Sequence, residues 1–220
     1  MAYHALAAFL FYMMDIQEVC ILLRTIALLL LAVGLFVIGY ASMQLNSVRQ
    51  LERVALDQAK SVLEQAALDQ GNGEVEKLGA KPSRPKLSFE NGQTIGILEI
   101  PSIQKELPIV EGTEEDSLKK GVGHYEGTVF PGQKDQILLS GHRDTVFTGL
   151  DKLKNGDTII VKMEHGTFVY AIVDTVIVDE NDKTVIRSTA PEEILTLSTC
   201  YPFGYIGNAP QRYIVYAKPK

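Results

Sequence analysis

Residues 194–212, ILTLSTCYPFGYIGNAPQR, are the stretch on which the interpretation of the whole chain depends. This stretch places Cys200 at the end of a short apolar run, and Arg212 follows twelve residues later. Cysteine is the side chain that attacks carbonyls most readily near neutral pH, provided that a positive environment favours its thiolate. A second stretch, ILLSGHRDTVF at residues 137–147, places His142 directly after another apolar run. Three such side chains at the ends of predicted strands indicate a site for acyl transfer.

Each of these residues also has an ordinary interpretation. A lone cysteine is most often a small buried hydrophobe. A lone histidine is more often a hydrogen-bonded core residue or a surface residue, and an arginine is often an ordinary surface charge. The sequence context of the three residues favours the catalytic interpretation.

Three motifs in this chain resemble those of one enzyme family. TLSTC at residues 196–200 resembles the T-L-x-T-C motif of sortases, the membrane-anchored cysteine transpeptidases of Gram-positive bacteria, and SGHR at residues 140–143 resembles their G-H motif. Arg212 stands near the start of the last predicted strand, where that family keeps its arginine. The resemblance covers roughly residues 94–218 and includes GVGHY at residues 121–125.

Peptide transfer by this chemistry requires a nucleophile, a proton donor for the departing amine, and positive or hydrogen-bonding groups around the carbonyl oxygen. We expect Cys200 to be the nucleophile and His142 to be the general acid and later the general base. Arg212 is expected to hold the substrate carbonyl or the oxyanion, because its guanidinium stays charged and donates two hydrogen bonds. Three further residues are predicted to bind substrate: Thr199 beside the nucleophile, and Ser140 and Ser198 at positions that line the family's groove.

The resemblance also implies the substrates. They are surface proteins with a C-terminal LPxTG-like sorting signal, cut after Thr, and the acceptor is an amine of the peptidoglycan precursor. No cofactor is implied. The sequences SGHRD and LSTCYPF are most similar to those of class D sortases of Gram-positive spore-forming bacteria. The chain has no Asp-Pro-aromatic lid motif in its linker and no C-terminal membrane segment, so it departs from the pilus-polymerising class.

Composition excludes several other classes of protein. The chain has 220 residues, a formal net charge of −6 and no cluster of Lys and Arg, which argues against a nucleic-acid surface. The sequence contains no phosphate-binding glycine loop, no HExxH pair and no CxxC pair, so no nucleotide or metal site is predicted.

Residues 25–43, TIALLLLAVGLFVIGYASM, carry no charge over a length that spans a hydrocarbon core as a helix. We interpret them as a transmembrane signal anchor, and a cleaved signal peptide is the alternative, since small residues follow the apolar run. Residues 1–24 then form a cytoplasmic segment, and the catalytic domain is extracellular. The charges on either side do not decide the orientation; the expected function does. Cys20 and Cys200 lie on opposite sides of this anchor and are not expected to pair.

The rest of the chain divides into segments with different patterns of apolar and turn-forming residues. Residues 44–86 are expected to form a helical stalk, over 44–70, and a linker, over 71–86. Residues 87–220 are predicted to be an all-β catalytic domain, with one short helix over 114–120 that Thr113 caps. Many short strands punctuated by turns suggest a closed barrel or a sandwich. The resemblance implies the family's fold, a closed eight-stranded β-barrel. Seven strands are predicted, over residues 94–100, 105–110, 136–140, 158–162, 167–178, 194–199 and 213–217.

Two features need separate interpretations. The acidic run at residues 179–182 resembles a calcium site of some class A sortases, but an exposed turn is the favoured interpretation. His124 lies in a family-like run and is predicted to be structural, because it lacks the Ser-Gly approach that precedes His142. Two other functions stay open: a different cysteine acyl transferase of the L,D-transpeptidase kind, and a non-enzymatic surface domain on a stalk.

Overall fold

The computed structural model describes residues 2–72, 87–205 and 207–220. The chain divides into two compact units, residues 1–47 and 48–220. Most of the linker predicted over 71–86 lies outside the described residues. The predicted domain boundaries at residues 24, 43 and 86 stay predictions.

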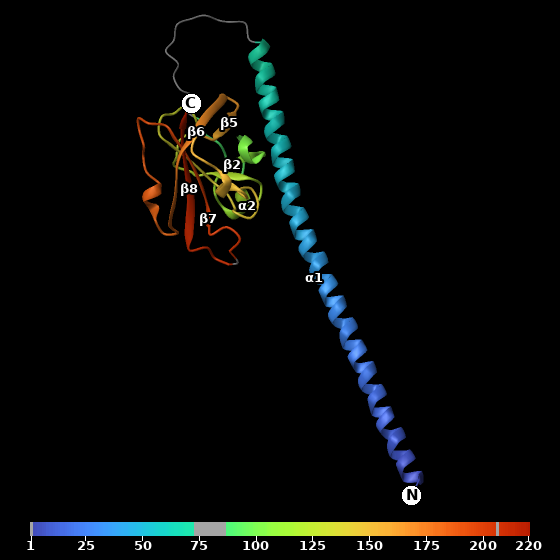
Figure 1. Cartoon of the computed structure of the whole chain (residues 1–220). Coiled ribbons are helices and arrows are strands. Elements are labelled where there is room, and N and C mark those ends of the chain that lie inside the picture. The colour runs from blue at the N-terminus through green and yellow to red at the C-terminus, as the bar shows by residue number, and fades with distance from the viewer. Residues whose placement is uncertain (1, 73–86, 206) are drawn as a thin grey trace, which may run out of the picture. The chain divides into compact units, whose positions relative to one another are not determined.

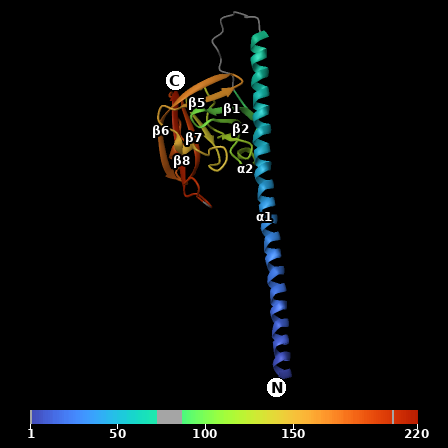
Figure 2. The ribbon, with the colours of Figure 1, turned by 45° about the vertical axis from the view of Figure 1, so that its right-hand side comes forward.

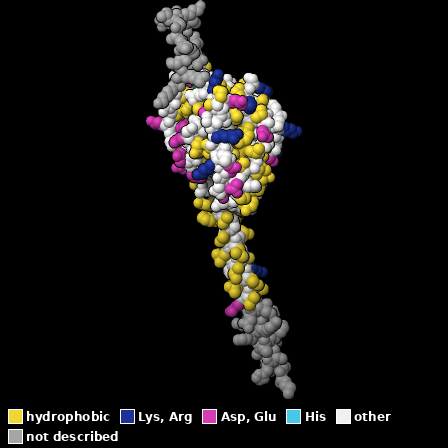
Figure 3. Space-filling model, turned by 90° about the vertical axis from the view of Figure 1, so that its left-hand side faces the viewer, with side chains coloured by type: hydrophobic (Ala, Val, Ile, Leu, Met, Phe, Trp, Pro, Cys, Tyr) yellow, Lys and Arg dark blue, Asp and Glu magenta, His cyan; other side chains and the backbone are white. Residues whose placement is uncertain are grey.

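The N-terminal part of the chain is a single helix, α1 (Ala2–Asn72), which includes the helix expected over 44–70. Within residues 18–68 it contains a segment that is long and apolar enough to cross a membrane, judged by length and composition. Large hydrophobic side chains are exposed along this segment, and Figure 3 shows many of them on the visible face of the helix. The predicted transmembrane segment, 25–43, lies inside it. A cleaved signal sequence has the same properties, so that alternative stays open.

The second unit contains a closed barrel of eight strands, as predicted (Figures 1 and 2). Around the barrel the strand order is β1-β2-β3-β4-β7-β8-β6-β5. Two neighbouring pairs are parallel, β2 with β3 and β4 with β7, and the other pairs are antiparallel. The strands are β1 (Thr94–Ile100), β2 (Lys105–Glu111), β3 (Val122–His124), β4 (Gln136–Ser140), β5 (Thr158–Met163), β6 (Gly166–Asp179), β7 (Ile194–Tyr201) and β8 (Gln211–Pro219).

Four short helical segments or turns connect these strands. The helix α2 (Glu115–Leu118) precedes β3, and three 3-10 turns are η1 (Pro101–Ile103), η2 (Leu150–Lys152) and η3 (Lys183–Val185). The helix α2 is shorter than the predicted 114–120, and its N-cap residue is Glu114. The predicted cap at Thr113 is therefore wrong, because the helix begins one residue later than that cap requires.

The barrel interior is filled by side chains from all eight strands. In β5, alternate residues are buried, namely Ile159, Val161 and Met163, which is the period of a strand with one face on the core. Residues 136–139 of β4 are buried without alternation, so both faces of this strand are covered. A packed interior of this kind supports the residues at its rim on rigid strands.

The connection between β6 and β7 is held to the barrel by Asp135, the residue before β4. Its carboxylate accepts hydrogen bonds from the backbone N–H groups of Thr189 at 2.5 Å and Ala190 at 3.1 Å, and from the Ser188 hydroxyl at 2.9 Å. The Thr189 N–H, together with the other donors, lowers the pKa of the Asp135 carboxyl. This anchor matters for the site because the same connection begins with Glu180, which lines the pocket described below.

Candidate active site

Cys200 and Arg212 are direct partners on two neighbouring antiparallel strands. In the pairing of β7 with β8, the Cα atoms of Cys200 and Arg212 lie opposite each other. Residues opposite each other in this way are close neighbours across the ladder. The turn between β7 and β8 therefore brings together two residues that are twelve positions apart in the sequence.

His142 reaches the same end of the barrel from β4. The strands β4 and β7 are parallel, with Ser140 opposite Ser198, so their C-terminal ends lie at one rim. His142 follows Ser140 by two residues, and Cys200 follows Ser198 by two residues. The parallel register thus brings His142 and Cys200 together from positions far apart in the sequence.

Gly141 allows the chain to turn tightly between β4 and His142. A Cβ atom at this position would lie 2.6 Å from Val146 Cγ2 and 2.8 Å from Phe147 Cδ2, which is closer than real contacts permit. Only glycine fits without movement of the buried Val146 and Phe147 side chains. The glycine of the SGHR motif is therefore required by packing directly beside the histidine.

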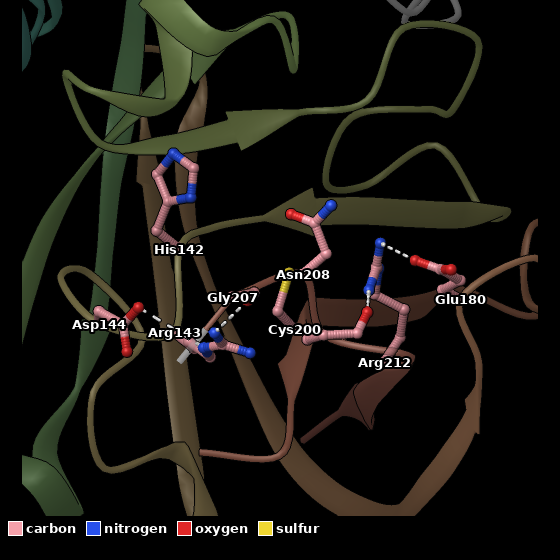
Figure 4. Close-up of a pocket in the computed structure, with 9 residues that line it drawn as sticks. His142, Arg143, Asp144, Glu180, Cys200, Gly207, Asn208 and Arg212 are labelled. Carbon is pink, nitrogen blue, oxygen red and sulfur yellow. Dashed lines mark hydrogen bonds and ion pairs between the residues drawn. The ribbon is translucent and has the colours of Figure 1, made fainter. Parts of the chain in front are cut away.

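These three residues line one pocket of about 290 Å³ (Figure 4). In this view His142 lies on one side, Arg212 lies on the other, and Cys200 lies between them. Within the part of the chain that the structure describes, no hydrogen bond joins Cys200 to His142. Such contacts are often long in a free enzyme and form when substrate binds. The described residues that line it are His142, Arg143, Asp144, Glu180, Cys200, Gly207, Asn208, Ala209 and Arg212.

The guanidinium of Arg212 is held in place by carbonyl groups and one carboxylate. Its Nη1 donates to the backbone oxygens of Ala209 at 3.1 Å and Gln211 at 3.0 Å. Its Nη2 lies 3.7 Å from Glu180 Oε2. The arginine thus has a fixed orientation. Among the residues that the structure describes, its Nη2 makes one long ion pair, which leaves capacity for a further acceptor.

Glu115 is a charged neighbour of His142. The His142 Nε2 lies 3.9 Å from Glu115 Oε2 in α2, and both side chains are partly or largely exposed. The other acidic residue beside this part of the pocket is Asp144. Because these carboxylates are exposed, solvent screens their effect on His142 strongly.

None of the three predicted substrate-binding residues is among those that line this pocket. Thr199 is almost fully buried, and its hydroxyl donates to the Gly141 carbonyl at 2.7 Å. Ser140 and Ser198 are half-buried partners in the pairing of β4 with β7. The Thr199 hydroxyl thus binds the backbone beside His142, and its contact with substrate stays a prediction. Contacts of Ser140 and Ser198 with substrate stay predictions.

The side chains of the acidic run at residues 179–182 are used within the protein. Glu180 pairs with Arg212, and Asp182 caps η3 by accepting from the Thr184 N–H at 2.9 Å. Among the residues that the structure describes, no group of three His, Cys, Asp or Glu residues could hold a metal ion. The exposed-turn interpretation of this run fits these contacts, and sequence inspection alone missed the pairing of Glu180 with Arg212.

His124 is a buried structural residue, in agreement with the prediction. It is 2% exposed, and its Nδ1 lies 2.9 Å from Glu111 Oε2. Its ring stacks on that of Phe130, with centroids 4.4 Å apart. It is also absent from the lining of the pocket that contains Cys200.

A thiol, an imidazole and a fixed guanidinium around one pocket, at the rim of a closed barrel, are the parts that thiol-dependent acyl transfer requires. Comparison with known proteins agrees with this class. A family model for the sortase domain matches residues 98–220. The chain is 44% identical over 197 residues to Sortase D of Bacillus subtilis (strain 168), covering 89% of this chain and 98% of that relative.

Solved structures give the same result. The structure of a Clostridium perfringens Sortase D5 transpeptidase has a TM-score of 0.62 and 26% identity, covering 78% of this chain and 99% of that one. That of sortase C from Clostridium perfringens SM101 has a TM-score of 0.56 and 29% identity, covering 81% and 97%.

The chain belongs to the sortase family. Sortases are cysteine transpeptidases anchored in the membrane at the cell surface, and this chain is class D-like, as its similarity to Sortase D shows. Of the functions left open by the sequence, family membership decides for the cysteine transpeptidase over the non-enzymatic surface domain and the L,D-transpeptidase kind of enzyme.

Proposed function

We propose that this sortase cleaves a C-terminal LPxTG-like sorting signal of surface proteins and transfers the protein to an amine of the peptidoglycan precursor. The observation that carries this proposal is the convergence of Cys200, His142 and Arg212 on one pocket. Each of the three comes from a different strand or strand end, so the barrel supplies rigid positions for all of them.

The reaction then proceeds in two halves. The Cys200 thiolate attacks the carbonyl carbon of the Thr residue in the signal. The carbonyl oxygen becomes an oxyanion that Arg212 stabilises with the hydrogen bonds that its Nη2 can still donate beside the long ion pair with Glu180. The C–N bond breaks as His142 gives its proton to the departing amine, which leaves a thioester on Cys200.

The second half reverses the roles. The acceptor amine attacks the thioester carbon, His142 takes a proton from that amine, and the Cys200 thiolate leaves. The products are a new amide and the free enzyme. Acceptor and leaving amine use the same histidine, so one side of the pocket serves both steps.

A transfer assay tests this function directly. We expect the full chain in detergent micelles to convert an LPxTG-type peptide, in the presence of a soluble amine, into a product that ends in Thr joined to that amine. Mass spectrometry identifies this product, and hydroxylamine as acceptor should give the hydroxamate that marks a thioester. A peptide with the same residues in scrambled order is the matched control. An unchanged LPxTG-type peptide, or equal cleavage of the scrambled one, would refute the proposal.

We further propose that the N-terminus is cytoplasmic and that residues 87–220 are extracellular. The apolar segment in α1 supports one membrane crossing, and a cell-wall acceptor requires the catalytic domain outside. Protease added to intact protoplasts should therefore remove the catalytic domain, as detected by an antibody to its C-terminus. A cytoplasmic marker must survive the same treatment. Protection of the catalytic domain until the protoplasts are lysed would show the opposite orientation.

A further inference from the structure

Arg143, the residue after His142, is a buried cation whose contacts the proposed mechanism does not use. Its side chain is 8% exposed. Its Nη2 donates to the carbonyl oxygens of Tyr205 at 2.6 Å and Gly207 at 3.0 Å, and its guanidinium carbon lies 5.9 Å from the centroid of the Tyr205 ring. Both carbonyls belong to the connection between β7 and β8. Arg143 therefore joins the turn that carries His142 to the segment that follows Cys200.

The placement of His142 relative to Cys200 depends on a small set of such ties. The Gly141 N–H donates to the Ser198 carbonyl at 3.1 Å, and the Thr199 hydroxyl donates to the Gly141 carbonyl at 2.7 Å. These two bonds hold the backbone before His142 to the backbone before Cys200. The Arg143 guanidinium joins the backbone after His142 to the backbone after Cys200 in the same way. It binds the connection that carries Gly207, Asn208 and Ala209 along the pocket (Figure 4).

Arg143 is a costly residue for the stability of the fold. A guanidinium keeps its charge, and removing it from water is unfavourable unless its donors are all paired. Its Nη1 is buried, and the described part of the chain offers it no acceptor. Its ionic partner, Asp144, is 3.5 Å from Nε and largely exposed, so this pair is screened by solvent. A gain in folding stability therefore does not account for this arginine.

We propose that Arg143 is a positioning residue for catalysis, which clamps the connection between β7 and β8 so that Cys200 faces His142 across the pocket. This role rests on the proposed functions of Cys200 and His142. The guanidinium suits the task, because its Nη2 donates to two carbonyls of the connection while its Nε faces Asp144 from a different direction. Misplacement of reacting groups by about 1 Å is enough to cost roughly 100-fold in rate.

Replacement by methionine separates positioning from a purely structural role. Methionine fills similar space without the charge, and exchanging a buried ion for an apolar side chain is often neutral or stabilising. We expect Arg143→Met to keep or raise the thermal midpoint of unfolding while kcat for peptide transfer falls roughly 10- to 100-fold. The larger part of the loss should be in kcat rather than in KM. Arg143→Lys keeps the charge but not the planar guanidinium, so its kcat should lie between that of the unchanged chain and that of Arg143→Met.

The control is Arg187→Met, an equivalent change at an exposed arginine that does not line this pocket, and its kcat should be unchanged. All rates are measured on the full chain, well below its thermal midpoint. A kcat for Arg143→Met within about threefold of the unchanged chain would overturn the role of Arg143 alone. Absence of turnover in the unchanged chain would overturn the proposed function and this inference with it. Should Arg143→Met fail to fold, the kcat of Arg143→Lys decides by the same threshold.

Discussion

Replacement of Cys200 by alanine is expected to reduce both cleavage and transfer of an LPxTG-type peptide to the background rate. Alanine has no atom that can form the thioester, so neither half of the reaction has a route on the enzyme. Removal of the nucleophile from a well-studied serine hydrolase costs on the order of a million-fold in kcat. Steady-state turnover and mass spectrometry of the intact enzyme, which should show no acyl adduct, measure the effect.

Two controls separate chemistry from folding in this experiment. Cys200 is half-buried, and its replacement removes one sulfur atom, so the thermal midpoint should change little. Cys20→Ala removes the other thiol of the chain, which is exposed on α1, and should leave turnover unchanged. Turnover that persists in Cys200→Ala, or that disappears in Cys20→Ala, would show that the wrong thiol has been assigned.

Most of the barrel was predictable from local patterns. The predicted strands 94–100 and 136–140 coincide with β1 and β4, and the other five overlap their observed counterparts. Apolar runs bounded by turn residues are strong local signals, and these strands contain them. Closure of the barrel came from the family resemblance rather than from any single segment.

The strand β3 was missed because nothing in its own sequence marks it. It has three residues, Val122–His124, with a glycine at its centre. It is a strand only because β2 pairs with it in parallel and β4 pairs with it antiparallel. At Gly123, a Cβ atom would lie 2.4 Å from the Gly112 carbonyl oxygen, so the glycine that weakens the local signal is required by packing.

Some residues of the site were also predictable from local sequence, and others were not. Cys200, His142 and Arg212, which line one pocket, were assigned to the site because each ends or begins an apolar run within a recognisable motif. Arg143 and Glu180 were not, because the Tyr205 carbonyl that Arg143 binds and the Arg212 side chain that pairs with Glu180 lie more than thirty positions away, and only the folded chain brings them together. Thr199 was assigned to the substrate by its place beside Cys200. In a strand, neighbouring side chains point to opposite faces, and Thr199 points to the Gly141 backbone.

Replacement of His142 by alanine is expected to lower kcat by roughly 100- to 10,000-fold, the usual contribution of a general acid and base. This loss should exceed that of Arg212→Lys, which keeps a positive charge but not the planar fork. His124→Ala is the matched control, because it removes a buried imidazole outside the pocket. It should lower the thermal midpoint and leave kcat close to that of the unchanged chain. Steady-state rates with an LPxTG-type peptide and a free amine measure all three. Normal turnover in His142→Ala, or a loss of kcat confined to His124→Ala, would show that Cys200 uses a different proton donor.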